Sequence, residues 1–116
     1  MATILTTVAK EEGTYMITCA FTDEDGDAVA PDSITWTLSD SNGSIINSRE
    51  DVAVGSPASS VDIVLSGDDL AIQAGETAST VTRRITIEAV YDSDAGSDLP
   101  LKDEAVFPLE NLLNVT

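Results

Sequence analysis

The chain has no histidine, the commonest general base of enzymes. Among its 116 residues there is one cysteine, Cys19, so no disulfide forms within the chain and no Cys/His set is present for zinc. Because histidine is absent, serine–histidine and cysteine–histidine catalysis are also excluded. Aromatic residues make up only 4% of the sequence, which leaves little material for a sugar-stacking cleft. We expect a protein that is not an enzyme and holds no organic cofactor.

Basic residues are scarce as well. Five Lys and Arg stand against 21 Asp and Glu, which gives a formal net charge of −16. Such a surface repels the phosphates of nucleic acids and the head groups of anionic membranes. We therefore expect neither nucleic acid nor a membrane among the partners of the chain.

The beginning of the sequence also lacks the marks of export. Residues 1–13 have no basic start, no long apolar run and no clear cleavage site. No apolar stretch approaches the length that spans a membrane. Because 42% of the residues are hydrophobic, the chain has enough apolar material for one folded domain. We expect a complete single domain over residues 1–116, made and folded in a cytoplasm.

Apolar and polar residues alternate with a period of two along most of the chain. This period is typical of half-buried β-strands, and Thr, Val and Ile are abundant in the same runs. The sequence predicts strands over residues 3–9, 15–21, 34–38, 61–66, 84–91 and 105–109.

The segments between these runs are rich in turn-forming residues. Asn42-Gly43 predicts a hairpin turn between ITWTLS (34–39) and a further strand, SIINS (44–48), and residues 92–100 predict a loop. Residues 67–76 predict one helical turn, and Pro108 predicts an edge position or a bulge in the last strand. No amphipathic helix is indicated. The sequence thus predicts an all-β antiparallel sandwich of seven to eight short strands.

A cysteine and a tryptophan on successive strands make the pattern resemble the immunoglobulin-like sandwich. Cys19 lies on the second expected strand and Trp36 on the third. The chain departs from the antibody type, because Ala89 stands where the second cysteine is expected and Ile87 where the core tyrosine is expected. The resemblance implies an immunoglobulin-like β-sandwich, and with the alternation it predicts a core that includes Cys19, Trp36, Ile63 and Ile87.

A narrower resemblance covers most of the chain. FTDEDGDAVAPDSITWTLSD (21–40), the following Asn-Gly turn, SPASSVDIVLSGDDLAI (56–72) and VYDSDAGSDLPLKDE (90–104) resemble small immunoglobulin-like proteins encoded among the structural genes of tailed bacteriophages. The resemblance implies a non-enzymatic virion protein, made in the host cytoplasm, that decorates or cements the capsid. Its implied partners are other virion proteins, such as the major capsid protein, and further copies of itself.

Two alternatives to capsid decoration remain at this point. Related phage modules also occur on necks and tails, so a neck or tail component is the first alternative. A surface or adhesin-type binding module is the second, and it belongs to a different functional class. Adhesin modules are usually domains of long secreted chains, whereas this sequence is short and has no export signal.

The acidic run after the second expected strand raises the question of calcium. With Gly26 at position 6 of an EF-hand loop, Asp25 and Asp23 fall at positions 5 and 3, but Phe21 falls at position 1, where a ligand is required. The run is therefore not a complete linear site. In an immunoglobulin-like sandwich, however, loops 22–33 and 92–100 lie at the same end. A calcium site there would draw on Asp23, Asp25, Asp27, Asp92, Asp94 and Asp98. The alternative is a solvated acidic rim.

Candidate interface residues are few. Arg83 and Arg84 form the only basic doublet, and both they and Arg49 are expected either to pair with nearby acids or to anchor a partner. The apolar end of the chain, with Leu112 and Leu113, is expected either to complete a sheet or to pair with the edge of a neighbouring subunit.

Overall fold

The computed structural model describes residues 3–5 and 7–112, and strands dominate it. The prediction of an all-β chain is confirmed. In the described part of the chain, no helix is long and apolar enough to cross a membrane. The elements in chain order are β1 (Thr3–Ile4), β2 (Ala9–Lys10), β3 (Thr14–Ala20), β4 (Ser33–Asp40), β5 (Val52–Ala53), β6 (Ser60–Ser66), the 3₁₀ helix η1 (Gly67–Leu70), β7 (Thr80–Ser93) and β8 (Gly96–Glu110).

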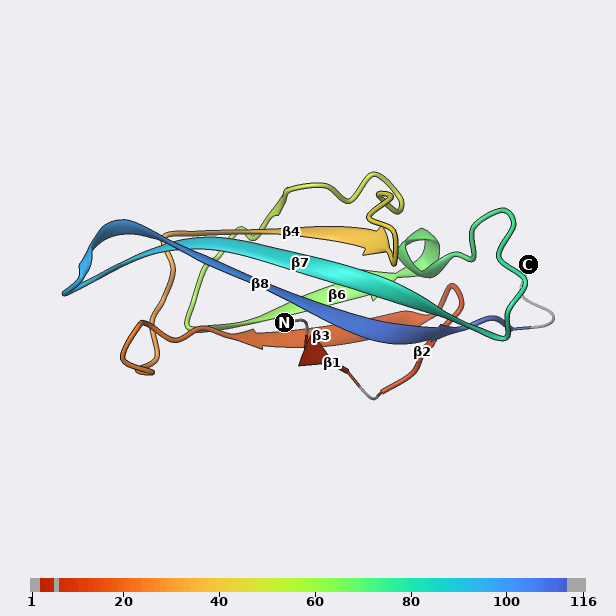
Figure 1. The fold of residues 1–116 in the computed structure, drawn as a ribbon, viewed down its shortest axis with the longest axis horizontal. Helices are drawn as coiled ribbons and strands as arrows, with labels where there is room; N and C mark the ends of the chain where they lie inside the picture. Colours follow the sequence, from red (N-terminus) through yellow and green to blue (C-terminus); the bar gives the residue numbers. More distant parts are fainter. Residues whose placement is uncertain (1–2, 6, 113–116) are drawn as a thin grey trace.

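The strands form two sheets (Figure 1). The first has the order β1-β8-β7-β4-β5, with β2 also paired to β8, and the second consists of β3 and β6. The pairs β3/β6, β4/β5, β4/β7 and β7/β8 are antiparallel, as predicted. The pairs of β1 and β2 with β8 are parallel, so the expectation of a wholly antiparallel sandwich is wrong for the N-terminal segment. The first and the last described strands belong to one mixed sheet.

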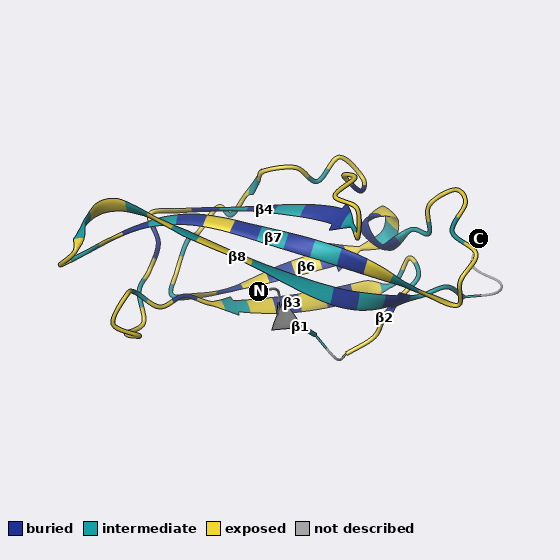
Figure 2. Ribbon diagram, in the orientation of Figure 1, coloured by how far each residue is buried: buried dark blue, intermediate teal, exposed yellow. Residues whose placement is uncertain are grey.

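One hydrophobic core lies between the two sheets. Alternate residues of β3 and β6 are buried, and they pack against the inward residues of β4, β7 and β8, as the burial colours of Figure 2 show. Trp36, Ile63 and Ile87 are buried members of this core. Cys19 is only half-buried, because it lies near the end of β3 beside a surface opening, and it packs against the margin of the core. The rings of Tyr15 and Phe107 stack across the core with centroids 4.7 Å apart.

The loop expected over residues 92–100 is mostly strand. Strand pairing of β7 with β8 continues to Ser93 and Gly96, so only Asp94 and Ala95 form the turn. Leu99 faces Tyr91 and Leu101 faces Ala89 in this outer part of the hairpin. Acids and glycine disfavour strands in general, but a hairpin that extends past the core exposes most of its side chains to water, where acids are tolerated. The hairpin makes the molecule long, with extents of 52 × 24 × 21 Å.

The other expected local features are found with smaller changes. Gly43, with φ +90°, closes the Asn-Gly turn after β4, but the segment that follows makes only an isolated bridge from Ile45 to Ser39. The helical turn expected within 67–76 is the short η1.

The N-terminal run is two short strands rather than one. Thr3 faces Ala105 and Ala9 faces Leu109. Between these two pairs the N-terminal segment is two residues longer than β8, so its pairing with β8 is interrupted. Pro108, which has no N–H to donate, lies on β8 between the two paired stretches.

A buried ion pair attaches the segment before β7 to the core. Arg83 is 0% exposed, and both terminal nitrogens of its guanidinium donate to Glu76, at 2.6 Å to Oε1 and 2.9 Å to Oε2. The Arg83 Nη2 also donates to the carbonyl of Ala71 at 3.3 Å. The hydrogen bonds from Arg83 are the main reason that the pKa of Glu76 is held below its usual range.

A buried carboxylate fixes η1 to the segment after β4. Asp69 is 2% exposed, and its Oδ1 accepts hydrogen bonds from Arg49 Nε at 2.7 Å and Asn47 Nδ2 at 2.8 Å. Its Oδ2 accepts from the backbone N–H of Ser66 at 3.2 Å. Burial acts to raise the pKa of Asp69, but the hydrogen bonds from Arg49, Asn47 and Ser66 outweigh it, so the pKa lies below its usual range.

Replacing Glu76 by Ala is expected to lower the free energy of unfolding by about 3 kcal/mol, because Arg83 then keeps a buried charge without its partner. Urea denaturation followed by Trp36 fluorescence measures the change. The matched control is Glu88→Ala, which removes an exposed pair with Lys102 at 3.5 Å and is expected to cost at most about 0.5 kcal/mol. Equal costs for the two variants would show that the Arg83 pair contributes nothing through burial.

Replacing Asp69 by Asn is expected to destabilise the protein at neutral pH and to matter less in acid. The lowered pKa of Asp69 contributes stability that is present above its unfolded value, about 3.9, and is lost as the pH falls through its folded value. The difference in free energy of unfolding between wild type and Asp69→Asn should therefore shrink between about pH 5 and pH 2. The exposed neighbour gives the control Asp68→Asn, and a pH-independent gap for Asp69→Asn would contradict the expectation.

Candidate functional site

The loop after β3 is organised by hydrogen bonds to an aspartate side chain. The Oδ1 of Asp23 accepts hydrogen bonds from the backbone N–H groups of Asp25 at 2.9 Å and Asp27 at 3.0 Å. The Asp23 backbone also bonds with the loop, donating to the carbonyl of Asp27 and accepting from Gly26, whose φ of +84° favours glycine. The alternation of acids and glycine thus builds a tight turn, which carries the side chains of Glu24 and Asp25 on its surface.

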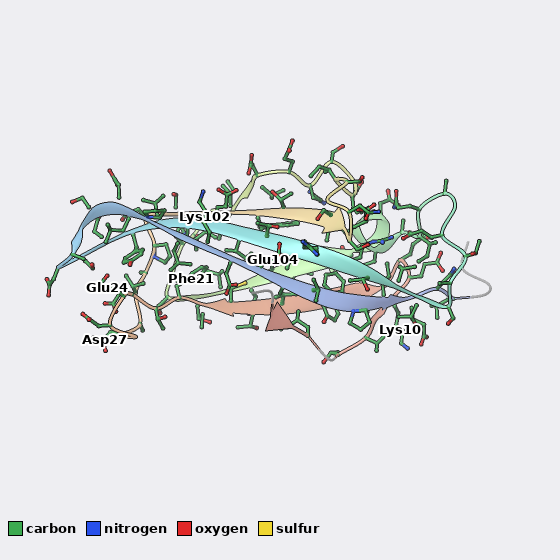
Figure 3. The ribbon with its side chains drawn as sticks, viewed as in Figure 1. Lys10, Phe21, Glu24, Asp27, Lys102 and Glu104 are labelled. Atoms are coloured by element: carbon green, nitrogen blue, oxygen red, sulfur yellow. The ribbon has the colours of Figure 1, made fainter. Side chains whose placement is uncertain are left out.

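This loop meets the β7–β8 hairpin through Glu24. Its Oε1 accepts hydrogen bonds from the Tyr91 hydroxyl at 3.1 Å and the Ser93 hydroxyl at 2.8 Å. Figure 3 shows Glu24 and Asp27 together at the end of the molecule where the hairpin projects. Burial, followed by the hydrogen bond to Glu24, raises the pKa of Tyr91. The loop and the hairpin therefore meet through a carboxylate that accepts hydrogen bonds from two hydroxyl groups.

A second acidic group lies where β4 begins beside β7. Asp32, Asp92 and Asp98 each place a carboxylate oxygen within 4.8 Å of the others, and all three residues are exposed. The backbone brings them together, because the N–H of Asp32 donates to Val90 at 2.7 Å and the N–H of Asp98 donates to the Asp92 carboxylate at 2.8 Å. The charge of Asp92 is the main cause of a raised pKa for Asp32.

The six aspartates expected at one calcium site are divided by the structure. Asp23 and Asp25 form one group with Glu24, and Asp92 and Asp98 form another with Asp32. The remaining two, Asp27 and Asp94, belong to neither group among the described residues. Both groups offer only carboxylate oxygens, which suit hard cations such as Ca²⁺.

Sequence reasoning omitted Glu24 and Asp32 from this set. Glu24 lies between Asp23 and Asp25, at a position that the alternating calcium-loop pattern does not use for a ligand. Asp32 comes next to Asp92 because Ser33 pairs with Val90, and this register is the signal that identifies it.

The candidate interface residues have unlike surroundings. Arg83 is fully buried with Glu76, so its side chain offers no surface to a partner, and Arg49 is 43% exposed while paired with Asp69. Arg84 contacts Glu104 at 3.4 Å on the outer face of the first sheet. Leu112 is half-buried and its N–H donates to Glu11, whereas Leu113 lies outside the described residues.

All five basic residues of the chain take part in ion pairs. The pairs are Arg49–Asp69, Arg83–Glu76, Arg84–Glu104, Lys10–Glu110 and Lys102–Glu88. The remaining acids give the surface its strong negative charge. A partner that binds by charge must therefore be basic or bring cations.

The other candidate surface is an apolar opening between the edges of β3 and β8. It has a volume of about 170 Å³, and its lining comes from both sheets and from Leu5. Cys19 lies in this lining, and Asp103 and Glu104 belong to its β8 side. Burial raises the pKa of the Cys19 thiol, and the charges of Asp103 and Asp62 raise it further. The thiol is therefore mostly protonated at neutral pH, which does not favour a nucleophile.

No family model, curated protein or solved structure matches the chain.

Replacing Asp32 by Asn is expected to raise the melting temperature in low salt. The raised pKa of Asp32 means that the folded state disfavours its charge, so removing the charge relieves repulsion from Asp92 and Asp98. Added salt should reduce the gain, because the group is exposed. Differential scanning calorimetry at neutral pH measures the shift, and a lower melting temperature for Asp32→Asn would contradict the expectation.

The control for this variant is Asp94→Asn, which removes the same charge from the exposed hairpin turn and is expected to leave the melting temperature unchanged. Calcium is then added to both variants and to the wild type, with sodium at matched ionic strength as reference. A solvated rim responds equally to the two salts. A larger shift with calcium that is lost in Asp32→Asn would show a bound ion.

Proposed function

We propose that this chain is an immunoglobulin-like structural protein of a tailed-phage virion and has no catalytic activity. The observation that carries the proposal is the strand order. In immunoglobulin-like sandwiches, strands C, F and G share one sheet and strands B and E share the other. Here β4, β7 and β8 lie in one sheet with the central order β8-β7-β4, and β3 pairs with β6 in the other. β5 lies beside β4, in the position of an extra C′ strand.

The buried tryptophan supports the same proposal. Trp36 lies on β4, in the position of strand C, and is 7% exposed within the core between the sheets. The segment of β1 and β2 runs parallel to β8 and closes part of the outer edge of the first sheet. This edge pairing and the core tryptophan add to the resemblance that the turn motifs carry in the sequence.

Within the virion, we assign the chain to the outside of the capsid as a decoration or cement protein. A β-domain with an acidic surface, whose basic residues all pair with acids of the same chain, suits docking on a protein shell and gives no attraction for packaged DNA. The proposed partners are the major capsid protein and further copies of the chain, assembled from protein made in the host cytoplasm. A position on the neck or tail is the competing assignment and is decided by stoichiometry.

Quantitative mass spectrometry of purified particles tests the assignment. A capsid decoration protein is expected in copy numbers on the order of hundreds, in fixed ratio to the major capsid protein, whereas a neck or tail protein is expected at about six or twelve copies. Particles grown without the gene should lack the protein and rebind it when purified chain is added. Absence of the protein from washed particles would overturn the virion proposal, and a low copy number would overturn the capsid assignment.

A further inference from the structure

Part of the last strand is an open edge in the described part of the chain. On the side away from β7, the first residue of β8 with a described partner is Ala105, which pairs with Thr3 of β1. The carbonyl of Val106 accepts from the N–H of Leu5 at 2.8 Å, so Val106 directs its backbone groups to this outer side. Alternation along a strand directs the backbone groups of Lys102 and Glu104 to the same side. The parallel register of Thr3 on Ala105 engages the Glu104 carbonyl with β1, so the open stretch among the described residues ends at Asp103. Pro100, which has no N–H, limits the open stretch at its far end.

The open edge has an apolar hollow beside it. The opening of about 170 Å³ described above is lined by Leu101 and Ala105 of β8 and by Cys19 and Phe21 from the end of β3. β3 pairs only with β6 among the described residues, so the edges of the two sheets border the hollow. A strand added to β8 would place alternate side chains over the hollow.

An acidic side chain stands at the mouth of this hollow. Asp103 alternates with Leu101 and Ala105, so it belongs to the face of β8 that looks toward the core. It is exposed, its Oδ1 accepts from the N–H of Glu104 at 2.8 Å, and it takes part in no ion pair among the described residues. An inward charge on an edge strand disfavours pairing with another apolar strand. It favours a strand that brings a basic side chain to the same place.

We propose that the open edge of β8 from Pro100 to Asp103 binds an extended segment of a partner protein in which an apolar residue and an arginine or lysine are two positions apart. The spacing of two follows from the strand, because it puts both side chains on one face. The apolar side chain fills the hollow beside Leu101 and Cys19, and the basic one pairs with Asp103. The backbone of Lys102 supplies the hydrogen bonds. This inference goes beyond the virion assignment and does not depend on it.

A second copy of the chain does not fit this edge. Pairing two β8 edges would bring the Asp103 carboxylates of both copies into one groove. Each chain carries a net charge of −16, and all of its basic residues are already in ion pairs. Like charges placed opposite each other in a sheet are destabilising. The charge of the groove therefore selects a basic partner of different sequence.

Cys19 provides the test, because it is the only thiol of the chain and lies in the hollow. The probe is the synthetic peptide Ser-Thr-Leu-Thr-Arg-Thr-Ser, blocked at both ends. Saturating peptide is expected to slow maleimide labelling of Cys19 at least about fivefold. It should also shift the backbone amide resonance of Lys102. Asp103→Asn is expected to weaken peptide binding about fivefold, the effect of one partly exposed charge pair.

Three controls make the result specific. Asp51→Asn removes the same charge at an exposed site outside the groove and should bind the peptide as wild type does. A peptide with leucine and arginine adjacent puts them on opposite faces and should not protect Cys19. A peptide with N-methylated backbone amides should fail to pair with the edge.

Equal weakening by Asp103→Asn and Asp51→Asn would overturn the proposal, because it would reduce binding to general charge attraction. Equal protection by the adjacent-residue or methylated peptide would overturn it too, since neither is able to form the paired strand. Protection of Cys19 that rises with protein concentration alone, together with a dimer in sedimentation, would assign the groove to a second copy instead.

Discussion

The strand pairing between β7 and β8 is the interaction on which the rest of the structure depends. The two strands pair from Thr80 opposite Glu110 to Ser93 opposite Gly96. β4 adds to the outer side of β7, and β1 and β2 add to the outer side of β8, so every other member of the first sheet is attached directly or through β4 to this hairpin. The second sheet is held by apolar contact with the inner face of the first, where Ile85, Phe107 and Leu109 are all buried. One ladder thus fixes the register of the first sheet.

The strands with one buried face were predicted well from the sequence. The alternation of apolar and polar residues is a local pattern, and burial of the apolar face in the core requires it. Trp36, Ile63 and Ile87 are buried where the alternation puts them. The alternation also put Cys19 on an inner face, but it did not reveal that the neighbouring sheet ends there and leaves the residue half-covered. Burial near the rim of a sandwich depends on how far the facing sheet extends, and that information is not local.

Other features lay beyond sequence reasoning for similar reasons. Residues 92–100 read as a loop because acids and glycine have low strand propensity, yet pairing with β7 supplies the backbone hydrogen bonds that propensity does not count. The grouping of Asp32 with Asp92 required the register of β4 on β7. Glu24 was missed since its partners, Tyr91 and Ser93, are 67 and 69 residues away in the sequence. The six-aspartate set did not resolve the side chains into the two groups that the structure shows.

The parallel pairing of β1 and β2 with β8 determines how the domain bears a force that pulls its two ends apart. The chain enters the first sheet at β1 and leaves it along β8, which runs in the same direction, so opposed forces on the two ends act along the strands in shear. The hydrogen bonds between parallel strands lie across the line of such a force and share the load, whereas bonds at an opening hairpin are broken one after another. The two paired stretches on either side of Pro108 therefore join the two ends of the fold where tension first reaches it.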